Sequence, residues 1–146
     1  MLMRTENVKG KRYQLLIDFL SKQCNRFAFV ENRKLMEIEE ERLAYIDNLI
    51  TDIKEHLIER RIQQEWETTK LAEDSAYVFY FQLNNATRQF LKERSNSLFD
   101  WISPELPEDL MFYQNDKCIL AGCSHEGFFM VDETIWDSFL LHLRRS

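Results

Sequence analysis

Apolar residues recur at steps of three and four in four segments of the chain, a spacing that predicts amphipathic helices. In the second segment the first residues are acidic and the last are basic, which is the order that the helix dipole favours. Asn84 or Asn85 is expected to cap the third helix, and Pro104 to end it. The four predicted helices cover about residues 9–24, 36–60, 84–102 and 132–145.

Shorter runs of apolar and aromatic residues predict β-strands between these helices. The run 76–82 is aromatic and too short for a core helix, so it predicts a central strand. The last three runs are joined by loops of a few residues, which predicts antiparallel hairpins and a three-stranded meander. The five predicted strands cover residues 27–30, 76–82, 110–113, 118–121 and 128–131.

The order of these elements predicts an α+β fold, in which helices pack on a mixed, mostly antiparallel sheet of about five strands. At 146 residues the chain fits a single α+β domain, 1–146, whose core needs no metal or disulfide. Eleven Phe, five Tyr and three Trp predict an aromatic interior. The polar start, the short apolar runs and the odd number of cysteines favour a cytoplasmic protein.

The acidic residues are concentrated in one part of the sequence. The first 99 residues have no net charge, whereas residues 100–137 have a net charge of −8. Such a field repels nucleic acid and attracts a basic protein, and the +5 charge of residues 1–34 allows head-to-tail self-association, for example a homodimer. This segment contains only one basic residue, Lys117. Its nine acidic residues are Asp100, Glu105, Glu108, Asp109, Asp116, Glu126, Asp132, Glu133 and Asp137.

Two short motifs in this segment carry a resemblance. The run 98–110 contains Leu106-Pro107-Glu108-Asp109-Leu110, and Ser124-His125-Glu126 follows after a short hairpin. Together they resemble a group of small, uncharacterised proteins of Gram-positive, Bacillus-like bacteria, some of which are labelled stage III sporulation proteins. The resemblance implies a shared fold and lineage but brings no activity, and Trp66-Glu67-Thr68-Thr69 stands where the group would have Trp-x-Gly-Thr.

The motif Ser124-His125-Glu126 allows a catalytic interpretation, but three adjacent residues do not form a nucleophile–base–acid relay. We expect instead a structural loop in which a buried His125 holds the turn against residues 106–110. Trp101, Pro104 and Pro107 are expected to shape the facing segment.

The cysteines allow a zinc site made by Cys118, Cys123 and His125, with Cys24 as a further ligand. The spacing is not that of paired zinc knuckles, and strand alternation would place Cys118 and Cys123 on opposite faces. We therefore expect ordinary buried thiols, no metal and no cofactor.

These observations favour a non-catalytic protein that binds a basic partner protein, such as an immunity protein that neutralises a basic toxin domain. The alternatives are a small enzyme of unfamiliar class that uses Glu108, Asp109 and His125, or an accessory protein of sporulation. Glycine-rich phosphate loops and nucleophile elbows are absent from the sequence. The residues expected to face the partner are Glu105, Glu108, Asp109, Asp116 and Glu126.

Overall fold

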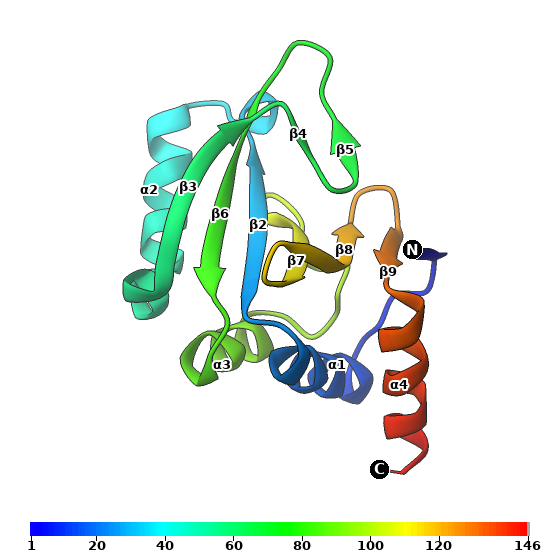
Figure 1. Ribbon diagram of the computed structural model, residues 1–146. Coiled ribbons are helices and arrows are strands. Elements are labelled where there is room, and N and C mark those ends of the chain that lie inside the picture. Colours follow the sequence, from blue (N-terminus) through cyan, green and yellow to red (C-terminus); the bar gives the residue numbers. More distant parts are fainter. Residues whose placement is uncertain (146) are drawn as a thin grey trace.

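Seven strands pair into one antiparallel sheet in the order β1-β9-β8-β7-β2-β6-β3 (Figure 1). The structure is a computed structural model, and it describes residues 1–145. A separate two-stranded hairpin, formed by β4 and β5, lies against the sheet. The strands are β1 (Leu2–Arg4), β2 (Arg26–Asn32), β3 (Leu57–Gln63), β4 (Glu65–Trp66), β5 (Thr69–Lys70), β6 (Ala76–Gln82), β7 (Glu108–Gln114), β8 (Lys117–Cys123) and β9 (Phe128–Val131).

Helices α1 and α3 lie side by side, and α4 follows directly from β9 at the other end of the sheet (Figure 1). Asn84 and Thr87 form a capping box at the start of α3, and the Asp132 carboxylate accepts from the backbone N–H of Ile135 at the start of α4. Among residues 1–145, no helix has the length and apolarity needed to cross a membrane. The helices are α1 (Lys11–Gln23), α2 (Glu39–Leu49), α3 (Asn85–Arg94) and α4 (Glu133–Arg144), with short 3-10 turns η1 (Arg33–Leu35) and η2 (Thr51–His56).

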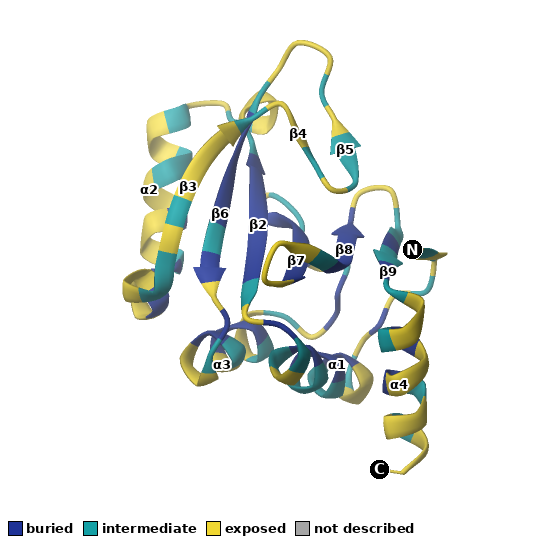
Figure 2. Cartoon of the chain, in the orientation of Figure 1, coloured by how far each residue is buried: buried dark blue, intermediate teal, exposed yellow. Residues whose placement is uncertain are grey.

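The two faces of the sheet are packed differently because side chains alternate along each strand. On β2, Phe27 and Phe29 belong to a large cluster to which all four α-helices contribute, and we call this the helix face. Ala28 and Val30 point the other way, toward Trp66 and the β4–β5 hairpin, and we call this the hairpin face. Figure 2 shows β2 buried along most of its length, whereas β3 at the edge is largely exposed.

The predicted α+β class is confirmed, but the predicted number of about five strands is too low. The second predicted helix, 36–60, is wrong in its last part: α2 ends at Leu49, and β3 begins at Leu57. Helical spacing continues as far as Leu57, but the open edge of β6 offers this segment a full ladder of hydrogen bonds. The connection after β3 also forms the unexpected hairpin β4–β5.

The third predicted helix is likewise too long, because α3 ends at Arg94. Leu98 and Trp101 are buried as expected, but they reach the core from a loop. The indole Nε1 of Trp101 donates to the Tyr13 hydroxyl at 2.9 Å, so Trp101 anchors this loop to α1. The role expected for Trp101 in the loop is therefore consistent with its packing, although the backbone around it is not helical.

Candidate functional site

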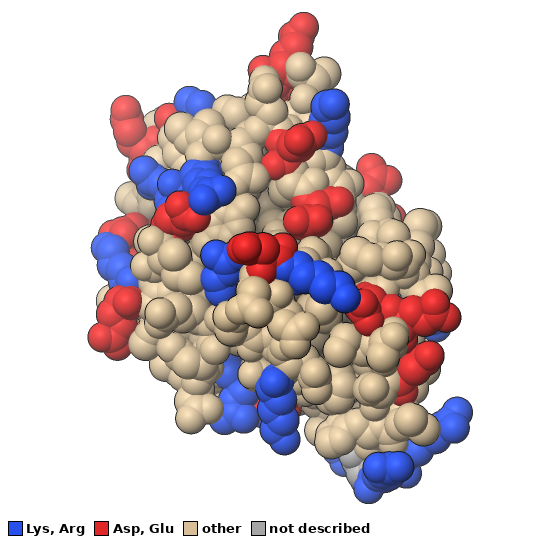
Figure 3. All heavy atoms as spheres, in the orientation of Figure 1, with Lys and Arg blue, Asp and Glu red and all other residues tan. Residues whose placement is uncertain are grey.

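The acidic residues expected to face a partner do not form one surface. Asp116 lies in the β7–β8 turn and Glu126 in the β8–β9 turn, at opposite ends of β8. Seven residues of strand separate these two turns, a distance of about 20 Å. Figure 3 shows acidic and basic side chains interspersed over the face in view, without a continuous acidic area.

Glu108 and Asp109 are not surface residues, which corrects the prediction that they face a partner. They are only 5% and 0% exposed, respectively. Both lie at the start of β7, where the strand joins the middle of the sheet beside β2. Sequence alone suggested a solvated loop, because two acids next to Pro107 are typical of one. Glu105, Asp116 and Glu126 are exposed as expected.

Glu108 belongs to a buried group of charges at the end of β2. The carboxylate of Glu31 accepts two hydrogen bonds from the Arg42 guanidinium, Nε to Oε1 at 2.6 Å and Nη2 to Oε2 at 3.1 Å. Glu108 lies beside this pair, and its Oε2 is 3.7 Å from Nδ1 of His125. We call Glu31, Arg42, Glu108, Asp109 and His125 the polar cluster.

Burial raises the pKa of both Glu31 and Glu108, because it disfavours a charged carboxylate. Hydrogen bonds from Arg42 partly offset this rise at Glu31, whereas the nearby Asp109 carboxylate adds to it at Glu108. The cluster holds three buried carboxyl groups and one partly buried guanidinium.

Asp109 is aimed at the hairpin face by an irregularity in the strand. Its φ angle is 58°, and the register between β2 and β7 shifts at this place. Its Oδ2 accepts from Nε1 of Trp66 at 3.0 Å, and its Oδ1 accepts from the backbone N–H of Ser124 at 3.0 Å. Burial raises the pKa of Asp109, and these two hydrogen bonds partly offset that rise. Asp109 thus ties the hairpin and the β8–β9 turn to the sheet.

His125 was expected to be buried and to hold the turn against residues 106–110, and the expected burial is wrong, because its side chain is 45% exposed. Its Nδ1 does lie 3.7 Å from Glu108 of that segment, and the backbone N–H of Ser124 adds a hydrogen bond to Asp109 at 3.0 Å. Of the other loop residues, Pro107 is buried, and the carbonyl of the exposed Pro104 accepts from Arg42 Nη1 at 2.6 Å.

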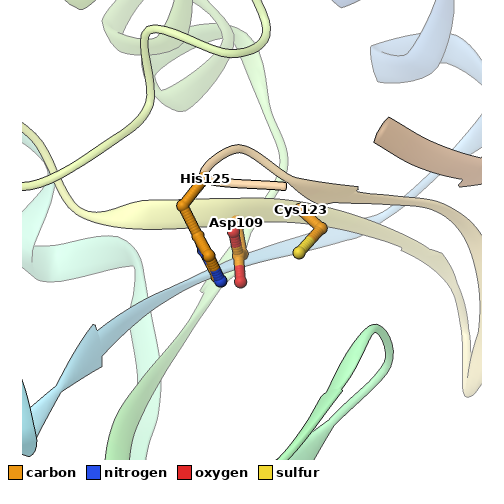
Figure 4. Close-up of side chains that lie close together, drawn as sticks. All are labelled: Asp109, Cys123 and His125. Carbon is orange, nitrogen blue, oxygen red and sulfur yellow. The ribbon is translucent and has the colours of Figure 1, made fainter. Parts of the chain in front are cut away.

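Cys123 joins Asp109 and His125 at the edge of the cluster. Figure 4 shows the three side chains pointing toward one region from neighbouring segments, and one potential ligand atom of each lies within 4.8 Å of the others. Burial raises the pKa of the Cys123 thiol, and the nearby hydroxyls of Thr68 and Thr69 in the hairpin partly offset that rise.

Strand alternation predicted that Cys118 and Cys123 lie on opposite faces of the sheet. In the structure Cys118 packs against the hairpin face, the same face as Cys123. The register shift between β7 and β8 accommodates one extra residue and reverses the alternation. Cys24 and Cys118 belong to no ligand trio among residues 1–145, and burial raises the pKa of each thiol to about 12.

Sequence reasoning missed Glu31, Arg42 and Trp66. A signal existed for Glu31, because a charged residue directly follows the buried run Phe27–Val30 in the same strand. Arg42 lies in a helix rich in charges, and Trp66 was noted only as part of a motif and not as a site residue.

A second concave surface lies where the loop 95–106 passes the end of α2. This groove has a volume of about 590 Å³ and contains the apolar residues Leu49, Ile102 and Leu106. Asp100 and Glu105, both exposed, contribute negative charge, and Arg94 contributes one positive charge. We call it the acidic groove.

The chain matches no protein-family model, no curated protein and no solved structure. The resemblance to Bacillus-like proteins therefore stays a prediction, and function has to be argued from the geometry of the two sites.

Proposed function

We propose that this protein is a non-catalytic binding protein whose acidic groove takes a basic, partly apolar segment of a partner protein. The observation that carries the proposal is the combination of an apolar floor with two exposed acids in one groove. An apolar side chain of the partner would fill the space over Ile102 and Leu106, while Asp100 and Glu105 would pair with its Lys or Arg residues.

The position of Glu105 is held by two side chains of α2. The Tyr45 hydroxyl donates to the carbonyl of Glu105 at 2.6 Å, and the Arg42 guanidinium donates to the carbonyl of Pro104 at 2.6 Å. A loop that is fixed before binding loses less conformational entropy when the partner arrives. This supports a recognition role for the loop that carries Glu105.

Selection of peptides on the immobilised protein tests the proposal. We expect enriched peptides to combine Lys or Arg with a large apolar residue, and to lose binding to the variant D100K/E105K. The double variant D116K/E126K is the matched control, because it changes the net charge equally at sites outside the groove. Peptides without basic residues, or equal losses in both variants, would contradict the proposal.

An immunity protein that neutralises a basic toxin domain is the particular form of this function that the sequence favours. In that case a gene for a large secreted protein with a basic C-terminal domain should neighbour this one. Co-expression should restore growth of cells that make the toxin domain, and the variant D100K/E105K should fail to do so. A gene located far from any toxin or secretion locus would count against this form.

The alternative enzyme would use Glu108, Asp109 and His125, which lie close together at the polar cluster. The cavity beside Glu31 and Glu108 has a volume of about 10 Å³, and neither Asp109 nor His125 lines it, so the three residues do not share one cavity. The acidic groove, at about 590 Å³, has room for a partner's side chain, and this favours the binding function. A sporulation role, a cytoplasmic location and a homodimer stay predictions.

A further inference from the structure

The region where Asp109, Cys123 and His125 meet combines three types of metal ligand on neighbouring parts of the backbone. Asp109 comes from β7, Cys123 is the last residue of β8, and His125 follows in the β8–β9 turn. The turn is closed by backbone hydrogen bonds from Glu126 and Gly127 to the carbonyl of Cys123. We propose that Asp109, Cys123 and His125 bind one divalent transition-metal ion, preferentially zinc.

The distances fit one ion after a side-chain adjustment. Zinc lies about 2.0–2.3 Å from its N, O and S ligands, so two ligands of a tetrahedral ion are roughly 3.3–3.8 Å apart. The three ligand atoms lie within 4.8 Å of one another. The His125 side chain is 45% exposed, so a small rotation can move its ring by the roughly 1 Å that is needed.

The charge of the surroundings favours a cation. Glu31, Glu108 and Asp109 are all buried; Arg42 pairs with Glu31, whereas neither Glu108 nor Asp109 forms an ion pair with a Lys or Arg of the described residues. Buried carboxylates without enough positive charge are unfavourable, and a divalent ion would supply that charge. This is independent of the ligand geometry, because Glu31 and Glu108 are not ligands.

The groups around the three ligands also fit a metal centre. Glu108 Oε2 lies 3.7 Å from Nδ1 of His125, where it can orient the imidazole, as carboxylates do for metal-bound histidines. Trp66 and the Ser124 backbone orient Asp109 and leave each carboxylate oxygen a free lone pair. The Ser124 hydroxyl, between Cys123 and His125 in sequence, is buried without a partner among residues 1–145.

The mixture of ligands selects the kind of ion. Calcium and magnesium prefer sites made of oxygen atoms alone, whereas thiolate with imidazole and carboxylate suits zinc or cobalt. Three protein ligands leave a fourth tetrahedral position for water, and exposure of His125 provides access from solvent. This inference reverses our expectation that the chain binds no metal, and it does not depend on the acidic groove.

Titration of the reduced, chelator-treated protein with Co²⁺ and then Zn²⁺ tests the site. We expect one equivalent of Co²⁺ to give tetrahedral absorption bands and a thiolate charge-transfer band, and Zn²⁺ to displace it. C123A and H125Q should each weaken binding by at least about 100-fold, the upper end of what a lost second-shell partner costs.

C118A and H56Q are the matched controls, because they remove the other thiol of β8 and an imidazole outside the trio. Both should bind metal like the wild type. Binding that survives C123A and H125Q, or is lost in C118A, would overturn the assignment. Asp109 is left unchanged because its carboxylate also holds the turn. If C123A or H125Q does not fold, the wild-type spectrum still decides, since saturation without a thiolate band rules the site out.

Discussion

The two faces of the sheet are packed by different kinds of side chain. The helix face is filled by aromatic rings, such as Phe27 and Phe81, whose centroids stack at 5.0 Å. The hairpin face has small side chains, such as Ala28 and Ala121, and it is covered by a two-stranded hairpin instead of helices. Its border contains the Asp109–Cys123–His125 trio, whereas Glu31 of the polar cluster alternates onto the helix face, where Arg42 of α2 reaches it. The comparison indicates that aromatic packing dominates the helix face, while the hairpin face combines small side chains with the buried carboxylate of Asp109.

The largest effect that separates the two faces should come from truncating a core ring. Phe81→Ala removes a fully buried side chain from the helix face and should lower the free energy of unfolding by ~3–5 kcal/mol. Val78→Ala, in the same strand on the hairpin face, should cost about 2 kcal/mol for the carbons lost. Urea denaturation measures both. A loss below about 1 kcal/mol at Phe81 would show that this strand is misplaced.

A smaller effect should follow from breaking the link between the hairpin and the sheet. Trp66→Phe keeps an aromatic ring but removes the hydrogen bond to the buried carboxylate of Asp109. We expect a loss of ~1.5–3 kcal/mol, the range for a hydrogen bond to a charged group.

A double-mutant cycle with Asp109→Asn separates this bond from the packing of the ring. The two substitutions should cost less together than the sum of the single changes. Additive costs would mean that Trp66 and Asp109 act independently, and that the hairpin is held by apolar contacts alone.

The smallest effect concerns the pH dependence that the polar cluster produces. Burial raises the pKa of Glu108 in the folded protein above its unfolded value, so folding favours its protonated form. Its contribution to stability is fully present below the unfolded pKa and is lost as the pH rises through the folded pKa.

Glu108→Gln should remove the loss of stability that Glu108 causes as the pH rises. The stability of the variant relative to wild type should therefore increase from acidic to neutral pH. Denaturation curves at several pH values between about 4 and 7 measure the trend, starting near the ordinary pKa of Glu. Asp116→Asn is a control, because Asp116 is fully exposed in the β7–β8 turn. A parallel pH dependence of Glu108→Gln and wild type would contradict the prediction.

The sequence by itself determined the elements whose local pattern and packing agree. The helix that became α4 was found because Asp132 caps it and its apolar stripe is buried, β6 was found from its aromatic run, and β7, β8 and β9 were found because apolar runs are separated by short turns. The same agreement explains why the α+β class could be predicted. The agreement failed for residues 57–60, where helical spacing competes with the open edge of β6, about 20 residues further along the chain.

Only the tertiary structure decided which acids are exposed and which are buried. Nothing in the local sequence distinguishes Glu105 from Glu108 or Asp109, yet the first lies in a groove and the others lie within the sheet. Their burial depends on β2 pairing with β7, on the irregular backbone at Asp109, and on partners 43 residues away at Trp66. Charge along a sequence is a local property, whereas the burial of a charge depends on contacts between distant segments, so the candidate site could not be assembled before the fold was known.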